Sequence, residues 1–136
     1  MLQLFTGIVV SIVCISIHAA ITTIVIHAAQ GAADRFKSNS RLLLIGTMIV
    51  TVAILMLAHM SEVAVWAAAY SLVGAAPEDA DGLYFAFVNY TTLGYGDVIP
   101  VSEWRLLGPA TAMCGILLFG WSTAVIFEVL RRTLGI

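Results

Sequence analysis

Charge is scarce in this 136-residue sequence and absent from long stretches of it. Asp, Glu, Lys and Arg make up only 10% of the residues, whereas 61% are hydrophobic; a typical soluble domain carries about 25% charged residues. No charged residue lies in 1–33, 42–61 or 106–127. Each stretch can hold the ~20 apolar residues that an α-helix needs to cross a bilayer. The composition excludes an ordinary soluble globule and predicts an all-α membrane protein with three spanning helices.

Cysteines and catalytic groupings are scarce as well. The two cysteines, Cys14 and Cys114, lie in apolar runs without the spacing of metal ligands, so we interpret them as small buried hydrophobic residues. The sequence has no phosphate-binding loop and no pairing of a nucleophile with a base, so neither enzymatic activity nor a cofactor is expected. The net charge of −2 gives no reason to expect a nucleic-acid partner.

The first apolar run, residues 1–30, is expected to be a retained membrane helix. It has no preceding basic residues and is about twice as long as the ~7–15-residue core of a secretory signal. It has no arginine at every third position, which argues against a voltage sensor. We expect this helix to pack outside the second one.

The remainder, residues 42–136, is expected to fold as one unit with two spanning helices around a shorter segment. In chain order we expect an outer helix at 42–73, an acidic loop at 74–81, a short helix at 82–91, a glycine-rich stretch at 92–97 and an inner helix at 103–132. The short helix has too few residues to cross a bilayer.

The basic residues indicate an orientation. The loop at 31–41 holds three of the six basic residues, and Arg131 and Arg132 close the last helix. All five lie on one side of the membrane if the segment 83–97 dips in and returns without crossing. Because basic loops are usually cytoplasmic, we expect a re-entrant segment, a cytoplasmic C-terminus and an N-terminus outside.

The glycine-rich stretch is the strongest functional signal. Non-helical backbone at membrane depth is tolerated only where protein surrounds it or where it lines a hydrated path. Gly94 and Gly96 are separated by one residue, and glycine adopts backbone angles that other residues avoid. Alternating angles can turn successive carbonyl oxygens to one side, where they can replace the water shell of a cation.

Residues 91–97 read Thr-Thr-Leu-Gly-Tyr-Gly-Asp, which closely resembles the potassium-channel signature Thr-Thr-Val-Gly-Tyr-Gly-Asp. The order of helices and loops over 42–132 is also similar to that of small bacterial-type potassium channels of the two-helix pore-module (ion channel) family, with an extra helix at 1–30. The resemblance implies a potassium-selective channel for passive transport in a cell membrane, of the bacterial inner-membrane type. Its implied partners are K⁺, membrane lipid and further copies of the chain.

The resemblance also implies roles for individual residues. The selectivity filter would extend from Thr92 to Gly96. Its K⁺ sites would be formed by the Thr92 hydroxyl and by the backbone carbonyls of Thr92, Leu93, Gly94 and Tyr95. Thr91 would support the filter, Asp97 would lie at the outer mouth, and the ring of Tyr95 would brace the filter from behind. One chain supplies one filter strand, so a closed ring of carbonyls requires a homotetramer.

The sequence departs from the family pattern at several positions. Leu93 replaces valine, a conservative change because the carbonyl coordinates the ion. Tyr84 and Phe85 stand where many relatives have paired tryptophans. Val88 stands where some have a glutamate, so no buried acid pair with Asp97 is expected. These changes concern filter stability and inactivation more than the choice of ion.

The inner helix offers three candidate gate residues. Gly115 lies close to the hinge position of the family and Gly120 is a second hinge candidate, but small residues also serve helix packing. Glu128 can pair with Arg131 and Arg132 at i+3 and i+4. Alternatively, four copies of Glu128 would form a carboxylate ring that concentrates cations at the inner mouth.

Glu62 is the only charged residue in 42–73. It lies ~30 Å beyond Arg41 at 1.5 Å per residue, so we expect it at the outer membrane boundary, followed by Trp66 and Tyr70 as headgroup-level rings. His59 precedes Glu62 by three residues and can meet it on one helix face. This pair is either a proton sensor or a neutral, hydrogen-bonded contact.

His18 and His27 lie within the first apolar run, where ionisable residues are candidates for function. Their nine-residue separation places them on opposite faces of a helix, so the two do not share a metal site. A neutral, hydrogen-bonded histidine is the alternative for each.

Two other functions stay open. One is a weakly selective cation channel of the same fold, which relative K⁺ and Na⁺ permeability would distinguish. The other is a non-conducting, channel-like sensor or assembly subunit, which would have no need of the filter chemistry.

Overall fold

The computed structural model describes residues 1–35, 41–77 and 80–134. The described residues form four α-helices and a 3₁₀ turn: α1 (Leu2–Arg35), α2 (Arg41–Val73), α3 (Gly82–Tyr90), the turn at Ser102–Trp104 and α4 (Leu107–Leu134). α1, α2 and α4 are each long and apolar enough to cross a membrane. The predicted all-α fold with three spanning helices is therefore confirmed.

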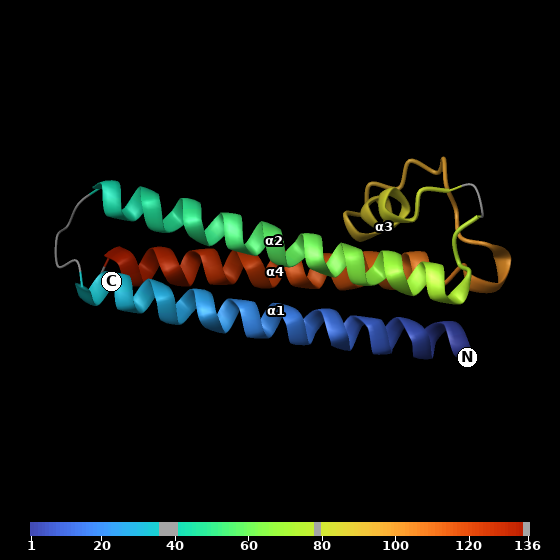
Figure 1. Cartoon of the computed structure of the whole chain (residues 1–136), viewed down its shortest axis with the longest axis horizontal. Helices are drawn as coiled ribbons and strands as arrows, with labels where there is room; N and C mark the ends of the chain where they lie inside the picture. Colours follow the sequence, from blue (N-terminus) through green and yellow to red (C-terminus); the bar gives the residue numbers. More distant parts are fainter. Residues whose placement is uncertain (36–40, 78–79, 135–136) are drawn as a thin grey trace.

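The three long helices lie side by side, with α4 between α1 and α2 in the view of Figure 1. The N-terminus lies at one end of the bundle, and the C-terminus lies at the other end near the α1–α2 connection. α3 and the loop that follows it leave α2 and rejoin α4 at the end that holds the N-terminus. The segment is thus re-entrant, and Arg41 lies at the same end of the bundle as Arg131 and Arg132, as the charge pattern predicted.

Two predicted boundaries were wrong. α1 continues to Arg35, so the first residues of the expected loop at 31–41 are helical. Residues 28–33 contain four alanines, the best helix former, and a single glycine costs only about 1 kcal/mol relative to alanine. α4 begins at Leu107 rather than at 103, because the chain first makes the 3₁₀ turn.

The packing of α1 also differs from expectation. We predicted that it lies outside the helix at 42–73, but α1 contacts both α4 and α2, and α4 the more extensively. Gly7 permits this approach, because a Cβ added there would lie 3.0 Å from the Ala110 Cβ of α4. Small residues allow such close contact between membrane helices. Cys14 of α1 and Cys114 of α4 are buried and free, as predicted.

The core between α2, α3 and α4 is aromatic. Tyr70 of α2 packs against Phe85 of α3, with ring centroids 4.8 Å apart, and its hydroxyl lies 2.5 Å from the Thr111 hydroxyl of α4. Trp66 packs against Tyr70 at 5.9 Å. Both rings are fully buried in the bundle, where α3 and α4 pack against Tyr70. Their expected position at the headgroup boundary stays a prediction.

Candidate functional site

α3 is short, but its first turn is firmly capped. Asp81 is the N-cap, and its Oδ1 accepts hydrogen bonds from the amides of Leu83 at 2.9 Å and Tyr84 at 3.2 Å. An aspartate at this position satisfies amides that have no partner within the helix and typically contributes about 1 kcal/mol. The cap therefore defines where the chain turns inward.

The glycine-rich stretch remains attached to the C-terminal end of α3. The Leu93 amide donates to the Val88 carbonyl at 3.0 Å, and the Thr91 hydroxyl donates to the Phe87 carbonyl at 2.7 Å. These bonds occupy carbonyls of the last turn that would otherwise lack partners. The start of the predicted filter is thereby held against the helix.

The backbone of the predicted filter alternates. Thr92, Gly94 and Gly96 have φ values of 60°, 55° and 78°, so every second residue is in the left-handed region. The unusual angles at the two glycines agree with the sequence-based expectation, whereas that of Thr92 was not anticipated. A β-branched residue rarely adopts a positive φ, and such conformations cost about 1–3 kcal/mol each and cluster at functional sites.

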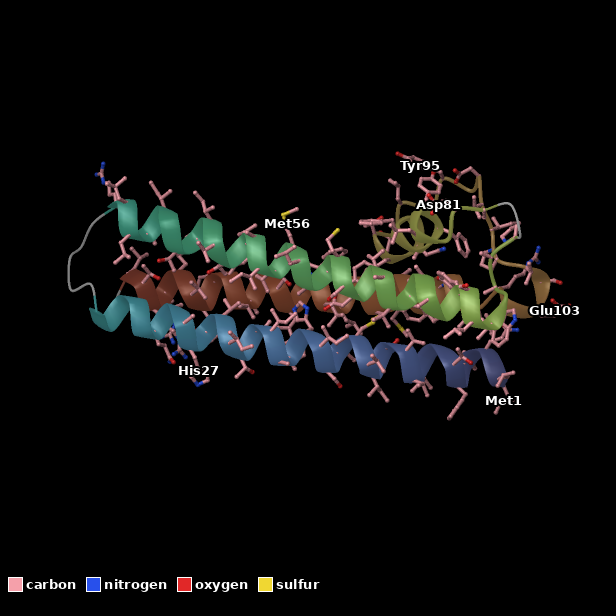
Figure 2. All side chains as sticks on the ribbon, in the orientation of Figure 1. Met1, His27, Met56, Asp81, Tyr95 and Glu103 are labelled. Atoms are coloured by element: carbon pink, nitrogen blue, oxygen red, sulfur yellow. The ribbon has the colours of Figure 1, made fainter. Side chains whose placement is uncertain are left out.

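The predicted filter is exposed along its whole length in the single chain. All residues from 91 to 97 are exposed, including Leu93 at 52% and Tyr95 at 69%. In Figure 2 the Tyr95 side chain lies at the edge of the molecule, on the far side of α3 from α1. Irregular backbone at membrane depth requires a protein or water surrounding, so one chain leaves this segment incomplete. The bracing role of the Tyr95 ring stays a prediction.

A contact not anticipated from the sequence holds the C-terminal end of the stretch. The Tyr84 hydroxyl donates to Asp97 Oδ2 at 2.6 Å. This bond lowers the pKa of Asp97 and, through the same interaction, raises the pKa of Tyr84. A phenol thirteen residues from an aspartate gives no local sequence signal, because only the re-entrant path brings the two together.

Gly115 is packed too closely to be read as a hinge alone. A Cβ added there would overlap the backbone carbonyl of Tyr90, whereas a Cβ at Gly120 would meet nothing within 4 Å. α4 is continuously helical through both positions. The geometry favours the packing interpretation for Gly115, and the hinge roles of both glycines stay predictions.

Glu128 makes the ion pairs considered from its spacing. Arg131 donates to both carboxylate oxygens, with Nε and Nη2 at 3.0 Å, and Arg132 also donates to Glu128. These contacts support the interpretation of an ordinary paired charge. A carboxylate ring formed by four copies of Glu128 stays a prediction.

A buried polar cluster is the feature that sequence reasoning missed. Glu62 is fully buried within the bundle, and its expected depth at the outer membrane boundary stays a prediction. Its Oε1 lies 2.8 Å from His18 Nδ1, and its Oε2 lies 3.0 Å from His59 Nδ1. The spacing identified the His59–Glu62 pair, but His18 comes from another helix and has no such signal. His27 is exposed, and its Nδ1 lies 2.7 Å from the Thr23 carbonyl of its own helix, so the two histidines of α1 do face apart.

Comparison with known proteins identifies the family. The family model described as "Ion channel" matches residues 42–132, about two thirds of the 136 residues. The chain belongs to the ion channel family. The matched region begins in α2, includes α3 and the exposed glycine-rich stretch, and ends in α4, whereas α1 precedes it. No curated protein and no solved structure matches the chain. The channel is thus a multi-pass membrane protein with its re-entrant segment inside the family's domain.

Proposed function

We propose that this channel conducts K⁺ selectively and passively through a filter formed by residues 92–96 of four identical chains. The observation that carries the proposal is the alternating backbone of Thr92, Gly94 and Gly96 within a stretch that reads Thr-Thr-Leu-Gly-Tyr-Gly-Asp. Carbonyl oxygens aligned on one axis replace the hydration shell of a permeating cation. The K⁺ sites are assigned to the carbonyls of Thr92, Leu93, Gly94 and Tyr95, with the Thr92 hydroxyl.

The exposure of the filter supports the tetramer. Carbonyls from one strand cannot surround an ion, and a fourfold ring places one strand from each chain around the axis. Exposed Leu93 and Tyr95 side chains would then be covered by neighbouring chains. The orientation follows from the charge pattern: the end with Arg131 and Arg132 is assigned to the cytoplasm, and the filter and N-terminus to the outside.

The test is ion flux through the purified channel in liposomes, under a K⁺ gradient and then under a matched Na⁺ gradient. We expect K⁺ flux to exceed Na⁺ flux, and Gly94→Ala to abolish it because an alanine is strained at a φ of 55°. Gly74→Ala is the matched control, since Gly74 also has a positive φ, 64°, but lies outside the filter.

The outcomes separate the remaining candidates. Equal K⁺ and Na⁺ flux would retain the pore and overturn selectivity. Absence of flux from verified tetramers would overturn conduction and leave a sensor or assembly subunit. Loss of flux in Gly74→Ala as well as in Gly94→Ala would show that the effect is not specific to the filter.

A further inference from the structure

Five polar side chains from all four helices meet in the centre of the bundle. His18 comes from α1, His59 and Glu62 from α2, Tyr90 from α3 and Ser122 from α4, and each is buried. The family match does not include α1, so the cluster links an additional helix to the pore unit. Buried polar groups of this kind must satisfy one another, because neither lipid nor core supplies a partner.

The contacts form two layers. On one side, Glu62 lies 2.8 Å from His18 Nδ1 and 3.0 Å from His59 Nδ1, while Tyr90 Oη lies 2.9 Å from His59 Nδ1 and also donates to Glu62. On the other side, the Ser122 hydroxyl lies 2.9 Å from His59 Nε2 and 3.2 Å from His18 Nε2. Both imidazoles therefore bridge the same two groups.

The hydrogens of the cluster permit an arrangement that accepts a cation. With Glu62 ionised, two neutral histidines, Ser122 and Tyr90 supply four hydrogens for the six contacts. If both histidines carry hydrogen on Nε2, both donate to Ser122, and two Nδ1 lone pairs then face the carboxylate. That arrangement is repulsive unless a cation lies between them. If both histidines carry hydrogen on Nδ1 instead, both donate to Glu62 without a cation, so only the first arrangement holds a metal ion.

We propose that His18, His59 and Glu62, completed by Tyr90, bind one divalent transition-metal ion of the zinc class. The three ligand atoms of the first three residues lie within 4.8 Å of one another. Metal–ligand bonds of about 2.0–2.2 Å place the donors around one ion about 3–4 Å apart, so small side-chain rotations close the site. Two imidazoles and one carboxylate form a donor set that first-row divalent ions prefer.

The residues around the three ligands are also compatible with a bound ion. With the metal on both Nδ1 atoms, both Nε2–H groups donate to Ser122, as the second shell of a metal site requires. Glu62 as carboxylate and Tyr90 as phenolate would balance the two positive charges, with the Tyr90 proton released to water when the ion binds. A site without net charge costs least to bury in a membrane interior. A cavity of about 170 Å³, lined mainly by apolar side chains, borders His59 and Tyr90.

The site would attach three elements to one another. Its ligands come from α1, α2 and the last residue of α3, directly before the filter. The ion would therefore stabilise the position of the C-terminal end of α3 from outside the pore. Because metal that binds only the folded state stabilises it by mass action, zinc should raise the thermal unfolding temperature of the channel.

The test uses the full chain in detergent, stripped with a chelator, incubated with Zn²⁺ and separated from free metal by gel filtration. We expect about one zinc ion per chain, measured by elemental mass spectrometry, and a raised unfolding temperature. His18→Gln and Glu62→Gln should lose the ion, whereas His27→Gln should keep it. His27 is the matched control because it lies on the same helix, exposed and away from the cluster.

A further variant tests the site without removing a ligand, so that loss of zinc can be distinguished from misfolding. Ser122→Ala leaves every metal ligand in place and should weaken zinc affinity by about tenfold through the second shell. Wild-type protein that retains no zinc, or zinc retention that survives both His18→Gln and Glu62→Gln, would overturn the proposal. So would equal loss of zinc in His27→Gln. Zinc content is read without ion flux, so this result is independent of potassium selectivity.

Discussion

The hydrogen bond between Tyr84 and Asp97 lies at the C-terminal end of the proposed filter segment. Its 2.6 Å length and ionised acceptor make it a charge-assisted bond, although both groups are exposed and the bond is open to solvent. Tyr84 thus contacts Asp97, whereas the family resemblance suggested a partner for Asp97 only where a glutamate replaces Val88. Tyr84, which stands where many relatives have a tryptophan, therefore supplies a hydrogen-bond donor to Asp97.

Removing the Tyr84 hydroxyl should raise the pKa of Asp97. Because the bond favours the charged form, the folded-state pKa of Asp97 is lowered. The stabilisation is therefore present above the ordinary aspartate pKa of about 3.9 and is lost as pH falls through the folded-state value. In Tyr84→Phe we expect the Asp97 pKa to rise toward its ordinary value, as followed by carbon NMR of the labelled carboxyl group. Tyr70→Phe is the control, since the Tyr70 hydroxyl contacts Thr111 instead.

An Asp97 titration midpoint unchanged by Tyr84→Phe would contradict this account. It would mean that the phenol does not donate to the carboxylate in the protein in solution. A shift of equal size in Tyr70→Phe would point to a general effect on the core rather than to the bond.

At the scale of elements, the approach of α4 to α3 is decided by a glycine. α4 passes so close to the end of α3 that a Cβ at Gly115 would overlap the Tyr90 carbonyl. The same region contains Gly108, where a Cβ would lie 3.1 Å from the Asn89 side chain. Backbone atoms cannot move aside as the ends of flexible side chains can, so the first position is the more sensitive.

Gly115→Ala should therefore destabilise the channel by about 1–3 kcal/mol through overpacking. Gly120→Ala on the same helix should be neutral or slightly stabilising, because nothing lies within 4 Å of its Cβ and alanine is the better helix former. Thermal unfolding in detergent, followed by circular dichroism, compares the two. Equal unfolding temperatures for both variants would remove the packing role and return Gly115 to the hinge interpretation.

For the molecule as a whole, the proposed filter is an irregular segment that a single chain leaves exposed. Residues 91–97 are exposed in the single chain, while α3 behind them is anchored by the buried Phe85 and Tyr90. An exposed, irregular segment held in place by a buried helix fits an interface between subunits. The proposed tetramer gives that surface its partners.

The purified channel should accordingly run as a tetramer, with four times the 14.5 kDa chain mass by native mass spectrometry from mild detergent. The symmetric ring required by the filter explains the number four. A dimer or monomer that still supports K⁺-selective flux would contradict the proposed architecture. A stable tetramer without flux would keep the architecture and count against conduction.

The helices and the family were already indicated by the amino-acid sequence. Uncharged runs of membrane length predicted three spanning helices, the grouping of basic residues predicted a re-entrant segment, and the motif at 91–97 located the candidate filter. These signals are readable because each depends on composition or spacing along the chain. The His59–Glu62 contact was predictable for the same reason, since three residues separate the two on one helix.

The contacts between helices followed from the folded chain and not from the sequence pattern. The placement of α1 against α4, the packing of Gly115 on Tyr90 and the Tyr84–Asp97 bond all join residues without a periodic relation. The contact between buried Glu62 and His18 belongs with these, because the sequence of one helix does not indicate that a histidine of another helix is its partner. Helix faces in a membrane protein are apolar toward both lipid and neighbour, so the pattern along one helix does not tell which face is covered.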